Sequence, residues 1–215
     1  MSFAARARSA RESRPRLKKG FSVGLLGGSF NPAHPGHRRM SLAAMQRFQL
    51  DEIWWLVSPQ NPLKPLANMA PLSARLASAR GVARHPRIKV SAIEQSLGTR
   101  RTADTLPALK ARFPQVRFLW LMGADNLQQF HRWADWRKIA REVPIVVLAR
   151  PAYIGRSQFS PAMGWLRHFR RKSPAAWRSW PLPAIVIVNF GLDQRSATAI
   201  RNRTPDWATQ QDPQA

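Results

Sequence analysis

The sequence predicts a single α/β domain built on a Rossmann-like, doubly wound parallel sheet. Short apolar runs rich in Val, Ile and Leu recur along the chain, and helix-like stretches separate most of them. The length of 215 residues suits one domain that buries its own continuous core. This alternation indicates parallel strands that are covered by helices on both faces of the sheet. The strands are expected, in order, at residues 22–27, 52–59, 87–93, 116–122, 144–149 and 183–190.

The segments around these strands predict helices, an insertion and a tail. Apolar side chains recur three or four positions apart in residues 35–50 and 71–82, so both segments are expected to be crossover helices. Residues 151–183 are rich in Arg, Trp, Pro and Ser, which predicts a helical insertion with loops. Residues 1–20 are expected to form a disordered basic N-terminal arm before a folded domain over 21–215. The composition of the arm also fits a mitochondrial transit segment, and that alternative stays open.

Composition excludes several classes of protein. The chain has no cysteine, so a disulfide framework, a thiolate nucleophile and a cysteine-ligated zinc site are not expected. No apolar run approaches the roughly 20 residues that cross a bilayer, and basic residues interrupt the N-terminus where a secretory signal would lie. We therefore expect a cytoplasmic protein that does not bind membranes. The net charge of +24 favours polyphosphate or nucleic-acid partners, although basic residues can equally serve solubility.

The segment GGSFNPAHPGH at residues 27–37 directly follows the first expected strand and precedes a helix. In an open α/β sheet, ligands bind at the carboxyl ends of strands, where a helix N-terminus offers free N–H groups to a phosphate. His34 and His37 can both donate hydrogen bonds to one phosphate as negative charge accumulates on it. The alternative is a Gly/Pro turn with incidental or metal-binding histidines, but no clustered carboxylate nearby completes a metal site.

A second segment, RSATAIR at residues 195–201, follows the last expected strand. Ser196 and Thr198 can cap a helix, or their hydroxyls can hold β- and γ-phosphate oxygens while Arg201 pairs with the polyphosphate. A doubly wound sheet can bring this segment face to face with residues 27–37. The sequence therefore predicts one phosphate site that is built from both ends of the chain.

Together with these segments, four further stretches resemble the bacterial nicotinate-nucleotide adenylyltransferases, a family of the HxGH nucleotidyltransferase superfamily. They are SPQNPLK at 58–64, TRRTADTL at 99–106, FLWLMGADNLQQFHRWADW at 118–136 and ARP at 149–151. Their order and spacing match the family, and the resemblance covers residues 21–203. It implies that residues 21–215 form an adenylyltransferase domain.

The resemblance implies that the 5′-phosphate of nicotinate mononucleotide attacks the α-phosphorus of ATP, giving deamido-NAD and pyrophosphate in NAD biosynthesis. A phosphate monoester has a second pKa of about 6, so this nucleophile is largely dianionic at neutral pH and needs no general base. Catalysis then depends on positioning and electrostatics, with Mg²⁺ carried by ATP. The residues implied to be catalytic are His34 and His37 at the α-phosphate, and Lys64 and Arg201 at the pyrophosphate.

The resemblance also assigns substrate contacts, and it assigns no residue to a metal ion. The ATP-binding residues that it implies are Gly27, Gly28, Ser29, Phe30, His34, Gly36, His37, Gly123, Asp125, Ser196, Thr198 and Arg201. The residues that it implies for the mononucleotide are Asn31, Thr102, Thr105 and Trp133. Trp133 would stack on the pyridine ring, although a tryptophan beside Trp136 can also be a core residue. Trp54, Trp55 and Trp120 are assigned to packing.

Other functions remain open at this stage. A nucleic-acid-binding protein would fit the charge and the many tryptophans, but the basic residues are scattered and form no recognised nucleic-acid motif. An adenylyltransferase could instead act on nicotinamide mononucleotide or another phosphate monoester. The sequence does not set the oligomeric state, so a homo-oligomer stays open.

Overall fold

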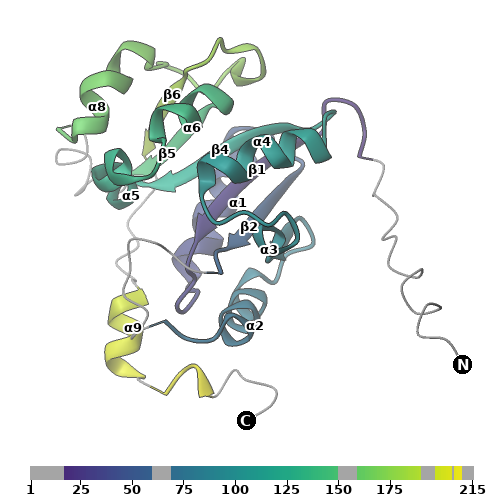
Figure 1. The fold of residues 1–215 in the computed structure, drawn as a ribbon, viewed down its shortest axis with the longest axis vertical. Coiled ribbons are helices and arrows are strands. Elements are labelled where there is room, and N and C mark those ends of the chain that lie inside the picture. The colour runs from purple at the N-terminus through teal and green to yellow at the C-terminus, as the bar shows by residue number, and fades with distance from the viewer. Residues whose placement is uncertain (1–16, 60–68, 150–158, 190–196, 205, 210–215) are drawn as a thin grey trace, which may run out of the picture.

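The structure, a computed structural model, describes residues 17–59, 69–149, 159–189, 197–204 and 206–209. It contains one six-stranded sheet, and every adjacent pair of strands is parallel (Figure 1). The strands are β1 (Ser22–Gly28), β2 (Glu52–Val57), β3 (Ile88–Ser91), β4 (Arg117–Gly123), β5 (Ile145–Ala149) and β6 (Ile185–Asn189). All six predicted strands are confirmed.

The strand order is β3-β2-β1-β4-β5-β6, which is the order of a Rossmann fold. From β1 the chain adds β2 and then β3 on one side of the sheet. It then crosses back and adds β4, β5 and β6 on the other side of β1, so the strand order reverses between β1 and β4. Side chains at the carboxyl ends of these two strands therefore flank a crevice. The predicted fold class is confirmed.

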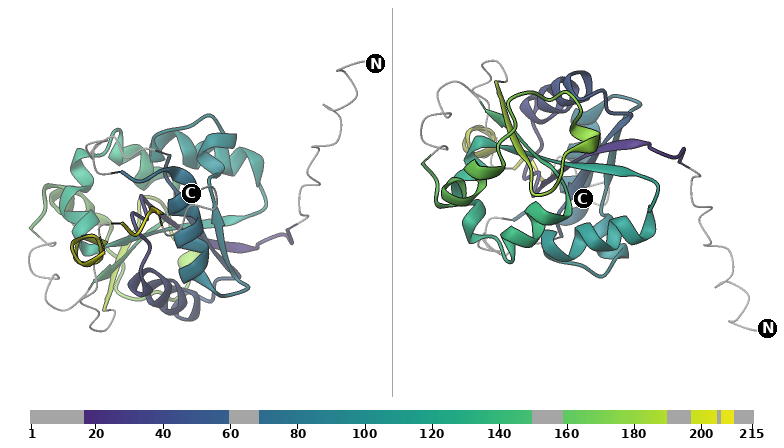
Figure 2. Two further views of the ribbon diagram at one scale, coloured as in Figure 1. Left: turned by 90° about the horizontal axis from the view of Figure 1, so that it is seen from below. Right: turned by 90° about the horizontal axis from the view of Figure 1, so that it is seen from above.

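Helices cover both faces of the sheet (Figures 1 and 2). The longer helices are α1 (Pro35–Arg47), α2 (Leu72–Ala83) and α4 (Thr102–Arg112). The shorter ones are α3 (Ile93–Ser96), α5 (Ala124–Gln129), α6 (Trp136–Glu142), α8 (Pro161–Leu166) and α9 (Ala197–Arg203), with 3₁₀ turns η3 (Phe130–Arg132), η4 (Arg167–Phe169) and η5 (Trp177–Ser179). The first crossover helix ends before the predicted residue 50, since Gln49 adopts a left-handed conformation with φ 50°.

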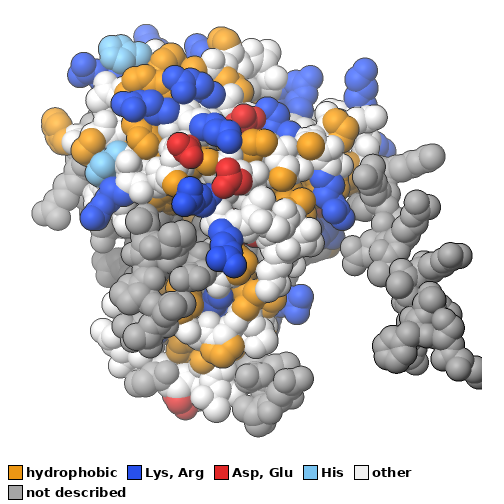
Figure 3. Space-filling view, in the orientation of Figure 1, with side chains coloured by type: hydrophobic (Ala, Val, Ile, Leu, Met, Phe, Trp, Pro, Cys, Tyr) orange, Lys and Arg blue, Asp and Glu red, His pale blue; other side chains and the backbone are white. Residues whose placement is uncertain are grey.

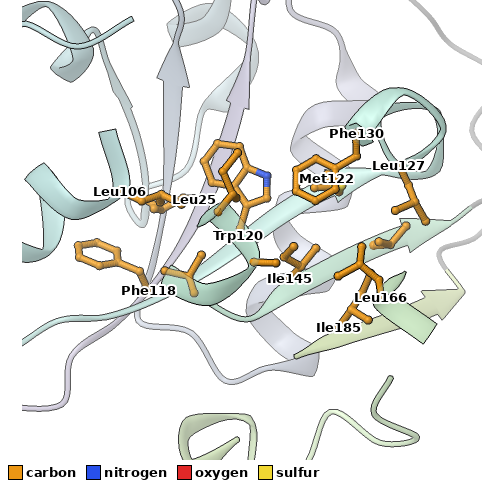
Figure 4. Close-up of a cluster of buried hydrophobic side chains, with 14 of the residues drawn as sticks. Leu25, Leu106, Phe118, Trp120, Met122, Leu127, Phe130, Ile145, Leu166 and Ile185 are labelled. Atoms are coloured by element: carbon orange, nitrogen blue, oxygen red, sulfur yellow. The ribbon is translucent and has the colours of Figure 1, made fainter. Parts of the chain in front are cut away.

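Two hydrophobic cores lie on opposite faces of the sheet. One packs α4, α5, α6 and α8 against side chains such as Leu25, Trp120 and Ile145, and Figure 4 shows Trp120 near its centre. The other packs α1 and α2 against side chains such as Trp55 and Leu121. Trp54, Trp55 and Trp120 are at most 9 % exposed, which confirms that they pack in the interior.

The described part of the predicted insertion is helical with loops, as expected. It contains α8, η4 and η5, while residues 151–158 lie outside the described residues. Trp177 on η5 is buried, and its Nε1 donates to the backbone oxygen of Phe48 at 2.9 Å. This bond ties the insertion to the end of α1.

The folded domain extends further toward the N-terminus than residue 21. Leu17 and Phe21 pack against the first core, and the Gly20 backbone N–H donates to Gln115 O at 3.0 Å. Residues 17–20 therefore belong with the domain, and residues 1–16 of the predicted arm lie outside the described residues. No helix in the described ranges is long and apolar enough to span a membrane.

Deleting residues 1–16 should leave kcat/KM within a few-fold at physiological salt. Charges farther than about 8 Å from a site are largely screened under that condition. Deleting residues 1–20 should in addition lower the melting temperature, because Leu17 and the Gly20 bond are lost. Equal melting temperatures for the two deletion variants would contradict this boundary. A collapse of activity when only residues 1–16 are deleted would also contradict it.

Candidate active site

A pocket of about 640 Å³ opens at the carboxyl edge of the sheet, where β1 and β4 end. Its walls come from the turn after β1, the start of α1, the segment before α4, the start of α5, the turn after η3 and the start of α9. The pocket thus lies at the reversal point of the strand order, where an open α/β sheet binds its ligands. It contains parts of both predicted phosphate segments.

The turn after β1 is shaped by backbone geometry and aromatic packing. A Cβ on Gly27 would lie 2.6 Å from Cη2 of Trp120, so a glycine is needed where the tryptophan ring covers the strand end. Phe30 adopts a left-handed φ of 46°, and its ring stacks on Trp55 at 5.0 Å and contacts His37 at 4.8 Å between centroids. These contacts hold the turn against the core, while residues of the same turn line the pocket.

The two histidines form the first turn of α1. His34 is the extended N-cap residue, Pro35 follows it in the helix, and the His34 backbone N–H donates to Nδ1 of His37 at 3.1 Å. Since Nδ1 of His37 accepts this bond, a neutral ring carries its proton on Nε2 and can donate it. The ring centroids are 3.8 Å apart, and both residues line the pocket. His34 is only 8 % exposed and is therefore more buried than a surface turn would predict.

Helix α2 supports this turn through the side chain of Arg75. Arg75 is 1 % exposed, and its guanidinium donates to the backbone oxygens of Ser29, Ser58, Pro59 and Ala70 at 2.6–2.9 Å. Burial lowers the pKa of Arg75 from its usual value, yet four carbonyl oxygens compensate the charge. The sequence analysis did not identify this residue, and no local pattern distinguishes it from the many exposed arginines.

The last helix closes the same site from the other end of the chain. Nη1 of Arg201 donates to the backbone oxygen of Asn31, and Nη2 donates to Oγ1 of Thr198 at 3.2 Å. Thr198 lines the pocket, and Oδ1 of Asn31 accepts from the backbone N–H of Ala70 at 3.2 Å. The turn after β1 and helix α9 therefore meet, as the sequence predicted for a doubly wound sheet.

The end of β4 supplies the opposite wall. Gly123 is the extended N-cap of α5, and a Cβ there would collide with the carboxylate of Asp125. Gly123 and Asp125 both line the pocket. The glycine is thus required for the Asp125 side chain to turn back toward the strand end.

Of the residues predicted to bind the mononucleotide, some line the pocket and one, Thr105, lies behind its wall. Thr102 and Trp133 line the pocket, and the Trp133 ring stands edge-on to Trp120 with 6.2 Å between centroids. Thr105 is 0 % exposed and is not part of the pocket wall. Its hydroxyl bonds with Glu94, Thr99 and the Arg101 backbone instead, so it supports the wall from behind.

Most of the predicted site residues meet in this one pocket. The predicted residues that line it are Gly27, Gly28, Ser29, Phe30, Asn31, His34, Gly36, His37, Thr102, Gly123, Asp125, Trp133 and Thr198. Lys64 and Ser196 lie outside the described residues. The wall also contains Trp120, which the sequence assigned to packing, and charged residues to which it assigned no role, among them Glu94, Arg100, Arg101 and Arg132.

The charges around the pocket suit an anionic ligand. Arg100, Arg101 and Arg132 line it, and on the face drawn in Figure 3 the basic side chains are dispersed among hydrophobic ones. A positive field of this kind attracts polyanions. Within the described ranges, no three His, Asp or Glu side chains are grouped closely enough to hold a metal ion.

The fold and this site define a nucleotidyltransferase, and comparison with known proteins agrees. Residues 25–203 match the model of the cytidylyltransferase-like family. A protein of Plasmodium falciparum described as a nicotinic acid mononucleotide adenylyltransferase has the same fold, with a TM-score of 0.59 and 15 % identity over 84 % of this chain and 82 % of that one.

Curated relatives narrow the class. A protein of Erythrobacter litoralis is 57 % identical over 86 % of this chain and 85 % of its own, and one of Cereibacter sphaeroides is 56 % identical over 83 % and 96 %. Each is named "Probable nicotinate-nucleotide adenylyltransferase", as is a Rhizobium johnstonii protein at 45 % identity over 87 % and 96 %. The chain belongs to the nicotinate-nucleotide adenylyltransferase family.

Proposed function

We propose that the protein transfers AMP from ATP to the 5′-phosphate of nicotinate mononucleotide, forming deamido-NAD and pyrophosphate. The observation that carries this proposal is the pair His34 and His37 at the reversal point of the sheet, in the turn whose Asn31 backbone oxygen accepts from Arg201 of α9. Paired donors at a helix start suit a phosphate on which charge develops. Membership of the family supports the choice of substrates.

The reaction needs no general base. An oxygen of the dianionic 5′-phosphate forms a bond to the α-phosphorus of ATP while the bond from that phosphorus to the α,β-bridging oxygen breaks. The bridging oxygen leaves on pyrophosphate. In this proposal His34 and His37 donate to the α-phosphate oxygens, and Thr198 of the pocket wall and Arg201 beside it bind the departing pyrophosphate. Lys64 and Ser196, which lie outside the described residues, keep the pyrophosphate role that the sequence assigns to them.

Mg²⁺ accompanies ATP in this proposal. Mg²⁺ usually binds through substrate phosphates and one or two carboxylates rather than through a cage of protein ligands, and Asp125 is a carboxylate in the pocket wall. When bound, the ion shields the triphosphate charge that the nucleophile must approach. The cytoplasmic location expected from the sequence stays a prediction.

The acid mononucleotide should be preferred over nicotinamide mononucleotide by roughly tenfold to a few hundredfold in kcat/KM. Thr102 is the first residue of α4, where backbone N–H groups point out of the helix, and arginines line the same wall. A carboxylate can accept from all of these donors, whereas an amide NH₂ leaves at least one of them unpaired. Parallel steady-state kinetics with the two mononucleotides test this, and equal efficiency would contradict the acceptor assignment.

Trp133→Ala serves as the companion variant. Stacking does not distinguish an acid from an amide, so this variant should weaken both acceptors by similar factors. The KM for ATP should stay nearly unchanged. Loss of the preference for the acid in Trp133→Ala would instead show that the indole itself selects the ring substituent.

A further inference from the structure

Glu94 is a buried carboxylate in the wall of the pocket, and the reaction described above does not use it. It lies in α3, directly after β3, and is only 7 % exposed. Oε1 accepts from Oγ1 of Thr105 at 3.2 Å. Among the described residues, Oε2 is buried without a hydrogen-bond partner, and Glu94 forms no ion pair with any of them.

The carboxylate is held in place but is not saturated. The Thr105 hydroxyl has a single hydrogen and faces Thr99 Oγ1 at 2.9 Å, Arg101 O at 3.0 Å and Glu94 Oε1 at 3.2 Å. Glu94 therefore receives at most one shared hydrogen bond, although a carboxylate can accept about four. Burial raises the pKa of Glu94, and the bond from Thr105 offsets only part of that rise.

The position of Glu94 indicates which ligand could satisfy it. Thr99, whose backbone N–H donates to Glu94 O at 2.9 Å, begins the loop that leads through Arg100 and Arg101 to Thr102. This loop includes Thr102, which the sequence assigns to the mononucleotide, and Arg100, Arg101 and Thr102 line the pocket. A small rotation about the terminal torsion of glutamate, which is broad, can present Oε2 to the pocket.

The chemistry of the mononucleotide limits the possible contact. Its carboxylate and its dianionic phosphate only accept hydrogen bonds, and its ring nitrogen is quaternary. The two ribose hydroxyls are its donors at neutral pH. A buried acceptor without a partner costs free energy until such a donor reaches it, so the ribose is the group that Glu94 can recognise.

We propose that Glu94 is a specificity-determining residue that accepts a hydrogen bond from a ribose hydroxyl of the mononucleotide, with Thr105 as the residue that orients it. This proposal rests on the proposed function. It also replaces the direct substrate contact that the sequence assigned to Thr105 with an indirect one through Glu94.

Kinetics with Glu94→Ala and Glu94→Gln test the proposal. For nicotinate mononucleotide, kcat/KM should fall by roughly tenfold to a hundredfold in Glu94→Ala, chiefly through KM, because a hydrogen bond to a charged group is lost. Glu94→Gln keeps the shape and should fall between Glu94→Ala and the wild type. The KM for ATP should change less than about twofold. Glu142→Gln, whose carboxylate pairs with Lys110 at 2.9 Å outside the pocket, is the matched control and should behave as the wild type.

Deoxyribose acceptors identify the contacted group. For the wild type, kcat/KM should be lower with one of the two analogues, 2′-deoxy or 3′-deoxy nicotinate mononucleotide, than with nicotinate mononucleotide itself. In Glu94→Ala, kcat/KM should be nearly the same with that analogue as with nicotinate mononucleotide, because the contact is already lost. An unchanged KM in Glu94→Gln, equal further losses with both analogues, or a changed acid-to-amide ratio would each overturn the proposal. If Glu94→Ala does not fold, Glu94→Gln decides alone. Failure of the proposed function would look different, because the wild type itself would then form no dinucleotide.

Discussion

Replacing His34 or His37 with alanine is expected to lower kcat by roughly a hundredfold or more, with a smaller effect on KM. Loss of one preorganised donor to a developing charge typically has an effect of this size. The two rings lie 3.8 Å apart at the pocket wall, so each has its own access to one phosphate. Initial rates at saturating ATP and mononucleotide provide the measurement.

The structure also predicts a modest loss of stability in these variants. Nδ1 of His37 accepts from the His34 backbone N–H at the start of α1, and loss of a capping bond usually costs about 1 kcal/mol. His37→Asn can keep an acceptor for the His34 backbone N–H while removing the Nε2 donor, so it should fold well and remain slow. His168→Ala, on the exposed turn η4, is the matched control. Full activity in either His34→Ala or His37→Ala would remove the central assignment.

Arg75→Met is expected to lower the free energy of unfolding by roughly 3–5 kcal/mol, because it leaves buried backbone oxygens without the donor that they have in the wild type. The backbone oxygens of Ser29, Ser58, Pro59 and Ala70 would all lose their partner. The turn that carries the histidines is one of the segments released, so kcat/KM should fall even where the protein is still folded. Urea unfolding followed by tryptophan fluorescence measures the difference.

Arg178→Met is the matched control for this variant. Arg178 also donates to a backbone oxygen, that of Gln49, at 2.7 Å, but it is exposed and lies outside the pocket. Its replacement should change the unfolding free energy by less than about 1 kcal/mol. If Arg75→Met is as stable as Arg178→Met, then the buried guanidinium does not hold together the segments that contain Ser29, Ser58 to Pro59, and Ala70.

The fold could be predicted because its signals are local. Each strand of a parallel sheet that is covered on both faces is a continuous apolar run, and the runs at 22–27 and 116–122 became the two strands that flank the pocket. The phosphate turn could be predicted for a similar reason, since its glycines, histidines and helix start are adjacent in the sequence. Contacts between distant segments, such as Arg201 with Asn31, followed only as a consequence of the topology.

The parts that the sequence did not predict depend on burial. Arg75 and Glu94 are two charged residues among many, and only the three-dimensional packing shows that each is almost fully enclosed. Thr105 was assigned to the substrate because of its motif, but it faces Glu94 and Thr99. The same packing places Trp120 in the pocket wall as well as in the core, because Gly27 leaves room for its ring.

The fate of the phosphorus atoms of ATP tests the central claim most directly. The purified protein is incubated with Mg²⁺, nicotinate mononucleotide and ATP labelled with ³²P at either the α or the γ position, and the products are separated. Label from the α position should appear in deamido-NAD, and label from the γ position should appear in pyrophosphate. Transfer of the γ label to the mononucleotide, or release of α label as free AMP with the mononucleotide unchanged, would contradict adenylyl transfer by this site.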